Sequence, residues 1–346
     1  MRKYIIDRFI QMLIVLAIVS LIVFVLFAML PGDYLDNDPF LTEVRRGELA
    51  KLYGFDKPLL VRYFHWLGHS IRGNFGDSLH YRMPVLELLG TYFKNSLLLT
   101  VTASVLAWGM AIAVGVYSAV KRYSKFDVIS TALVFAAMSL PSFFMGLMLV
   151  KIFAIDLRLL PVGSMVSSGS RAAGLAYLTD VLSHMILPVT VLALLSVGSL
   201  TRYFRSGMLD VIKQDYVRTA RAKGLRERAV ILRHAMKNAL LPAITLLGFK
   251  LPGLFSGAII TERIFNWPGI GYIQMEALYM RDYPVLMAFT MIFSLLTIIG
   301  SFLADVAYAF ADPRIKLGNL GGGSKKEKNK WLIVRLSGRR QERLRI

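Results

Sequence analysis

Residues 12–30 read MLIVLAIVSLIVFVLFAML, nineteen consecutive residues without a charged side chain. The hydrocarbon layer of a membrane is about 30 Å thick, and a helix of about 20 apolar residues spans it. This run is longer than the apolar core of a cleavable signal peptide. Its end, Phe27-Ala28-Met29-Leu30, also lacks the small residues typical of a cleavage site. We therefore predict that residues 1–30 hold a first membrane helix that stays in place.

Five further apolar runs follow along the chain. Leu97–Val120, Ile129–Val150 and Val285–Ala304 are each about as long as a membrane helix. Met185–Leu200 is shorter, and Ala239–Ile260 contains prolines, glycines and one lysine, which membrane helices tolerate when neighbouring groups satisfy the backbone. Hydrophobic residues make up 55% of the chain, which excludes a soluble globular enzyme. The sequence predicts an all-α, polytopic membrane protein with six transmembrane helices.

The basic residues predict the orientation of these helices. Of the 41 lysines and arginines, 27 fall in the segments 1–8, 121–128, 202–238 and 311–346, whereas 11 fall in the alternating segments 31–95, 156–184 and 264–284. Because basic loops stay on the cytoplasmic side, both termini are expected in the cytoplasm. The net charge of +19 then reflects membrane topology, and the lipid bilayer rather than a nucleic acid is the expected partner.

The segments between the runs complete the predicted organisation. Residues 31–95 carry eight basic and eight acidic residues with apolar residues between them, which indicates an extracytoplasmic subdomain of short helices. Residues 96–316 hold the other five helices and a cytoplasmic loop at 202–238, where two short helices are expected on either side of Gly224. Residues 317–346 form a basic, low-complexity cytoplasmic tail.

No enzymatic motif is found in the sequence. There is no phosphate-binding G-x-x-x-x-G-K-[ST] loop, no H-E-x-x-H motif and no G-x-S-x-G motif, and cysteine is absent. His65, His69 and His80 lie in one region, where a metal site is conceivable, but surface or packing histidines are the favoured interpretation. We therefore expect no catalytic residue, no metal and no cofactor in this chain.

Lys250 lies near the middle of Ala239–Ile260. A lysine facing lipid at that depth costs roughly 2.5–3.5 kcal/mol, so the side chain is expected to face protein or a water-filled path. Two interpretations stay open, since Lys250 could contact a transported substrate or only a neighbouring helix.

The loop at 202–238 carries a recognisable pattern. Residues 215–224 (DYVRTARAKG), followed by LRHA at 232–235, resemble the cytoplasmic coupling loop of ABC-transporter permeases. Within that group the chain is most similar to the first permease subunit of oligopeptide and dipeptide importers. The same resemblance extends over residues 1–316 and includes GNFGDS at 73–78, LPSF at 140–143, LLPVG at 159–163, FNWPGIG at 265–271 and DPR at 312–314.

The resemblance implies a type I ABC importer permease fold in a prokaryotic plasma membrane. It implies a non-catalytic subunit of an ATP-driven, binding-protein-dependent importer of di- and oligopeptides that works by alternating access. The implied partners are a second permease subunit, two ATPase subunits that bind ATP and Mg, and an extracytoplasmic substrate-binding protein. Nickel chelates, glutathione or oligosaccharides are alternative cargoes, and a stand-alone secondary carrier is a more remote alternative.

Two groups of residues are candidate sites. A small residue at Ala220 and a hinge at Gly224 permit a close helix–turn–helix with an arginine-rich face for an ATPase subunit. The full set expected to couple to the ATPase is Asp215, Arg218, Ala220, Arg221, Gly224 and Arg233. Trp267, Pro268 and Gly269 form a rigid turn that is expected at the outer mouth, where it could gate entry or simply pack.

Overall fold

The computed structural model describes residues 2–30, 57–169, 173–240 and 258–311. Lys250, the tail at 317–346 and residues 31–56 of the expected outer subdomain lie outside the described residues. The described part of the chain is helical and contains no β-strand. Its helices are α1 (Arg2–Met29), α4 (Leu59–Ile71), α5 (Val85–Val120), α6 (Lys125–Ser139), α7 (Ser142–Leu149), α8 (Leu175–Ile212), α9 (Asp215–Ala222), α10 (Glu227–Ala229), α11 (Met236–Ala239), α13 (Ile259–Ile264), α14 (Ile270–Met280) and α15 (Tyr283–Ala311), with π-helical turns at Val150–Asp156 and Val230–Ala235.

Four helices of the described chain, α1, α5, α8 and α15, are long and apolar enough to cross a membrane. They contain the expected runs at 97–120, 185–200 and 285–304 and all but the last residue of the run at 12–30, and α5 and α8 extend well beyond their runs. The sixth expected run, Ala239–Ile260, lies mostly outside the described residues. The helical, multi-pass fold class is therefore confirmed, whereas the number six stays a prediction.

The run Ile129–Val150, expected as one continuous span, is instead broken. Helices α6 and α7 meet at Leu140-Pro141 and are bent by 104° relative to each other, so together they form at most one interrupted span. Leu140 has an extended backbone (ψ 132°) because the ring of a following proline disfavours helical geometry. Pro141 then precedes α7 as its N-cap residue, a position where its missing N–H group is not needed for the helix.

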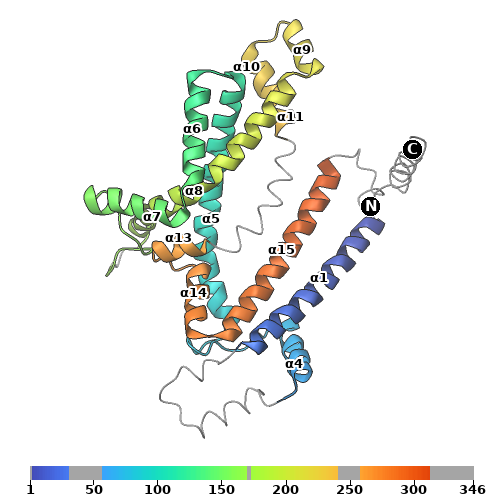
Figure 1. Cartoon of the computed structure of the whole chain (residues 1–346), viewed down its shortest axis with the longest axis vertical. Coiled ribbons are helices and arrows are strands. Elements are labelled where there is room, and N and C mark those ends of the chain that lie inside the picture. The colour runs from blue at the N-terminus through green and yellow to red at the C-terminus, as the bar shows by residue number, and fades with distance from the viewer. Residues whose placement is uncertain (1, 31–56, 170–172, 241–257, 312–346) are drawn as a thin grey trace, which may run out of the picture.

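Helices α5 and α8 form the central column of the molecule and lie side by side (Figure 1). Small residues line their interface, where Ala107 and Ala111 of α5 pack against Ala193 of α8. Gly115 brings the two backbones closest together. A Cβ atom on Gly115 would lie 2.9 Å from the carbonyl oxygen of Thr201 and 3.2 Å from the amide nitrogen of Arg205. Close approach of small residues is a common way to pack membrane helices.

The helices place different elements at the two ends of this column (Figure 1). Helices α9, α10 and α11 lie at one end, which we call the α9 end, and α4 and α14 lie at the other, which we call the α14 end. A second pair, α1 and α15, packs together and rises from the α14 end. At the α9 end, Asp127 at the start of α6 accepts two hydrogen bonds of 2.8 Å from the guanidinium of Arg205 on α8.

The α14 end is fastened by a hydrogen-bonded turn. Asp282, between α14 and α15, is fully buried and accepts a 2.6 Å hydrogen bond from the Ser78 hydroxyl and a 3.1 Å bond from the His80 amide. Gly76 accepts a 3.0 Å bond from the amide of Val85, the first residue of α5. The segment before α5 is thus held against the turn before α15, although about 200 residues separate them in sequence.

Replacing Gly115 with valine should separate α5 from α8. The added side chain meets backbone atoms that cannot rotate away, and overpacking of this kind costs about 1–3 kcal/mol. Thermal unfolding in detergent should show a lower Tm for Gly115→Val. Gly109 on the same helix has no atom within 4 Å of an added Cβ, so Gly109→Val is the matched control. Equal melting temperatures for the two variants would contradict the close contact.

Candidate functional site

The segment after α8 forms a helix–turn–helix, with α9 and α10 joined by a short turn. Gly224 lies in that turn at φ +76°, a left-handed conformation that glycine adopts without steric cost. The amide of Gly224 donates a 2.9 Å hydrogen bond to the carbonyl of Arg221, which closes the end of α9. A glycine at this position therefore permits a tight reversal of the chain.

One face of the helix–turn–helix packs on the long helices. Val217 and Ala220 of α9 are buried together with Val230 and Ala235 of the following π-helical turn. The same cluster includes Ala119 of α5 and Met208 of α8. Ala220, at 5% exposure, therefore faces its own chain, and a small residue there lets α9 lie close to the column.

An ion pair braces the turn across Gly224. The guanidinium of Arg221 donates hydrogen bonds of 2.7 Å and 3.1 Å to the two carboxylate oxygens of Glu227. These bonds lower the pKa of Glu227 and raise the pKa of Arg221 relative to their usual values. Because both side chains are substantially exposed, the pair orients the turn more than it stabilises the fold.

The opposite face of the helix–turn–helix is exposed and basic. Arg218 and Arg233 are exposed, and the nearest carboxylate oxygen of Asp215 lies 3.8 Å from a nitrogen of Arg218. Tyr216, Leu225 and Leu232 on the same loop are each more than 40% exposed. Arginine beside aromatic and aliphatic side chains is the composition typical of a protein-binding surface.

A second constellation lies at the α14 end, around the carboxylate of Glu262. This side chain is fully buried on α13 and accepts four hydrogen bonds from groups that belong to separate elements. The donors are the Ser96 hydroxyl (2.6 Å), the Gly271 amide (2.8 Å), the Tyr272 amide (3.2 Å) and the Ala258 amide (3.3 Å). The carboxylate thus caps the N-terminus of α14, where backbone N–H groups lack partners within the helix.

The turn at Trp267-Pro268-Gly269 is held by the same network. The indole of Trp267 is fully buried and donates a 3.1 Å hydrogen bond to the carbonyl of Asn95, whose side chain in turn donates a 2.8 Å bond to the carbonyl of Pro268. A Cβ on Gly269 would lie 2.4 Å from the Glu262 carboxylate. The structure therefore places these three residues in a packed turn, and their role at an outer gate or rim stays a prediction.

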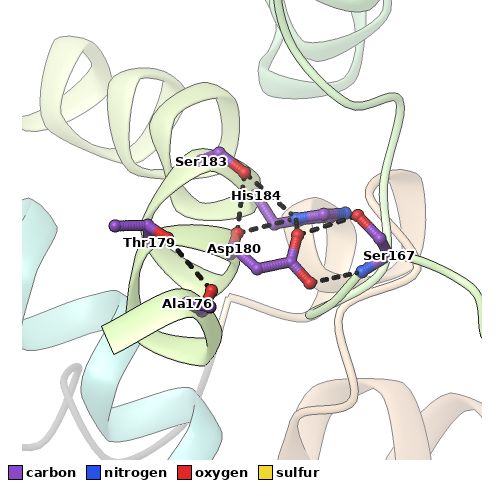
Figure 2. A network of polar contacts seen from close by, with 6 residues as sticks. All are labelled: Ser167, Ala176, Thr179, Asp180, Ser183 and His184. Atoms are coloured by element: carbon purple, nitrogen blue, oxygen red, sulfur yellow. Dashed lines mark hydrogen bonds and ion pairs between the residues drawn. The ribbon is translucent and has the colours of Figure 1, made fainter. Parts of the chain in front are cut away.

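The loop between α7 and α8 is tied to α8 by a polar network (Figure 2). The carboxylate of Asp180 accepts bonds of 3.0 Å from the amide and 2.8 Å from the hydroxyl of Ser167. On its other side, Nδ1 of the buried His184 lies 2.8 Å from the carbonyl oxygen of Asp180. Further along that loop the Ser164 amide donates a 2.7 Å bond to the carbonyl of Phe265, so the loop links α8 to α13.

Comparison with known proteins identifies the family to which the chain belongs. Residues 1–104 match the model of the N-terminal part of binding-protein-dependent transport system membrane components, and residues 111–317 match that of the inner membrane component itself. The chain belongs to this family of transport proteins. The resemblance to peptide-importer permeases noted in the sequence is confirmed by the individual relatives.

The relatives of this permease align over nearly their whole length. It is 39% identical over 319 residues to the oligopeptide transport system permease protein AppB of Bacillus subtilis, covering 91% of the chain and 100% of the relative. It is 36% identical to a putative peptide permease protein of Brucella suis, covering 92% and 100%. It is 34% identical to the glutathione transport system permease protein GsiC of Escherichia coli, covering 91% and 99%.

The structure brings most of the predicted site residues of the permease together. Asp215, Arg218, Ala220, Arg221 and Gly224 lie within one helix–turn–helix, and Arg233 lies on the π-helical turn that follows. Their role in coupling stays a prediction. Sequence reasoning missed Glu227, the partner of Arg221, and it missed Glu262 and Ser96. The only available signal for Glu262 was a single acidic residue close to an apolar run, three positions before FNWPGIG.

Replacing Glu262 with glutamine should destabilise the permease by about 2 kcal/mol or more. In glutamine an NH₂ group replaces one carboxylate oxygen, so it faces N–H or hydroxyl groups that now donate hydrogen bonds to that oxygen. A buried donor without an acceptor costs about 1–3 kcal/mol. Thermal unfolding of Glu262→Gln should be compared with Glu87→Gln, which changes an exposed carboxylate on α5. A Tm for Glu262→Gln as high as that of the control would contradict the assigned role.

Proposed function

We propose that this chain is a membrane-spanning permease subunit of an ATP-driven, binding-protein-dependent importer of di- and oligopeptides. The observation that carries the proposal is the full-length similarity to the peptide permeases of B. subtilis and B. suis. The substrate class named for those relatives is thereby extended to this permease. Hydrolysis of ATP is assigned to partner subunits, because the sequence contains no phosphate-binding loop.

The proposed topology has six transmembrane helices in a plasma membrane with both termini in the cytoplasm. The basic segment at 202–238 contains α9–α11, which supports a cytoplasmic position for the α9 end. The α14 end then faces outward, together with residues 31–95. We propose that this end receives the substrate-binding protein.

Coupling is proposed to begin at the exposed face of the helix–turn–helix. Arg218 and Arg233, with the apolar side chains beside them, would dock on one of two ATPase subunits that bind ATP and Mg. Arg221 instead holds the turn through Glu227. Because Val217 and Ala220 pack on α5 and α8, a displacement of the loop is passed directly to the two central helices.

Alternating access is proposed to involve this permease and a second permease subunit. Lys250 stays a candidate for the translocation path that the two subunits enclose. Trp267 is buried by its own chain and bonded to Asn95, so a gating role for Trp267-Pro268-Gly269 would require α13 and α14 to move as one body with the start of α5.

Glutathione is the second candidate cargo, because the E. coli relative is named as a glutathione permease. Reconstitution with the second permease, the ATPase subunits and the binding protein tests both candidates. ATP-dependent uptake of labelled peptides into proteoliposomes is the expected result, with labelled glutathione as the competing substrate. Uptake by this chain alone, driven by an ion gradient, would instead identify a secondary carrier.

Replacing Ala220 with tryptophan should uncouple the transporter. The larger side chain has no space against α5 and α8, so it would push α9 out of position at a cost of about 1–3 kcal/mol. We expect normal membrane insertion but at least a tenfold loss of ATPase binding or of peptide uptake per ATP hydrolysed. Ala220→Ser, which adds one small atom, is the matched control. Full uptake by Ala220→Trp would contradict the coupling role.

A further inference from the structure

We propose that the α14 end carries a binding subsite for the two charged termini of a short peptide. In this subsite Glu276 binds the ammonium group and Arg263 binds the carboxylate, with tyrosines between them. The proposal rests on the proposed function, because it assumes that peptides pass this end of the permease. Its two charged residues, Glu276 and Arg263, belong to neither the coupling loop nor the Glu262 network.

Glu276 provides a carboxylate without a basic partner. It lies on α14, is partly buried, and accepts a hydrogen bond from the hydroxyl of Tyr81. No lysine, arginine or histidine among the described residues forms an ion pair with it. Burial and the bond to Glu276 raise the pKa of Tyr81, so its hydroxyl keeps its proton and orients the carboxylate. A carboxylate held in this way, with no cation beside it, is suited to bind an ammonium group.

Arg263 provides the complementary charge on the neighbouring helix α13. Its exposed guanidinium lies 5.0 Å from the centre of the Tyr272 ring, a cation–π contact that holds the group over the aromatic face. Within the described part of the chain it forms no ion pair with a carboxylate. Guanidinium groups bind carboxylates through two parallel hydrogen bonds, so Arg263 is suited to a peptide C-terminus.

Tyrosines form the wall between the two charges. Tyr81, Tyr92 and Tyr272 come from the segment before α5, from α5 and from α14, and each packs on the same buried apolar cluster. Their rings are therefore fixed, and their hydroxyl groups can bond to peptide carbonyl and amide groups. Such contacts recognise the backbone of a peptide and not its side chains.

The spacing along the helices limits the ligand to short peptides. Tyr272 and Glu276 are one helical turn apart, a rise of about 6 Å, and the guanidinium of Arg263 lies 5.0 Å from the centre of the Tyr272 ring. The two charged groups are then on the order of 10 Å apart, which an extended chain of about three residues spans. The chemistry therefore favours a zwitterionic peptide of two to four residues.

Direct binding to the transporter tests the subsite without interference from the binding protein. The complex of both permeases and the ATPase subunits, in nanodiscs, is titrated with trialanine, N-acetyl-trialanine and trialanine amide, and Kd is measured by saturation-transfer NMR. The wild type should bind trialanine most tightly. Glu276→Gln should raise the Kd for trialanine and for trialanine amide by about 10- to 100-fold and leave the Kd for N-acetyl-trialanine unchanged. Arg263→Gln should raise the Kd for trialanine and for N-acetyl-trialanine and leave the Kd for trialanine amide unchanged.

Control variants separate binding from folding. Glu87→Gln and Arg72→Gln change exposed charges outside the cluster and should leave all three Kd values unchanged. Equal binding of the three peptides by the wild type, or equal weakening of all three by the variants, would overturn the subsite. Uptake of trialanine by the wild-type transporter would still support the peptide function in that case, whereas absence of uptake of any peptide would overturn the function itself.

Discussion

The buried carboxylate of Glu262 is the interaction on which the arrangement of the α14 end depends. It accepts bonds from α5, from the residue before α13 and from the start of α14, so three separate elements meet at one pair of oxygen atoms. A buried carboxylate is stable only when such donors surround it. The turn at Trp267-Pro268-Gly269 is tight because Gly269 leaves room for this carboxylate. The Glu262 network thus supports both the turn and the proposed peptide subsite next to it.

The α9 end is built differently, from small apolar residues and one brace. Ala220 and Ala235 let the helix–turn–helix lie close to α5 and α8, while Arg221 and Glu227 fix the turn from outside. Its exposed face keeps arginines available for a partner. The inner face determines the position of the loop, and the outer face carries the proposed contact with the ATPase, so substitutions on the two faces should have separable effects.

The sequence predicted the long helices because uninterrupted apolar runs leave few alternatives, and it predicted the reversal at Gly224 because glycine alone separates two helical segments. It did not predict the bend at Leu140-Pro141, since the surrounding run is apolar on both sides of the break. It also missed Glu262 and Glu227. The role of each depends on donors that folding brings near it, Ser96 and Gly271 for the first and Arg221 across the turn for the second.

The length of α8 has a mechanical consequence. Its 38 residues extend over about 57 Å, nearly twice the thickness of the hydrocarbon layer, and it continues directly into the helix–turn–helix. A helix of this length acts as a lever. Tilting it by about 5° around its far end displaces the loop by about 5 Å, roughly one helical turn. Asp180 fastens the opposite end of α8 to the loop before it through the amide and hydroxyl of Ser167. If that fastened end is the pivot, small rotations there correspond to large displacements at the α9 end, where the proposed ATPase contact lies.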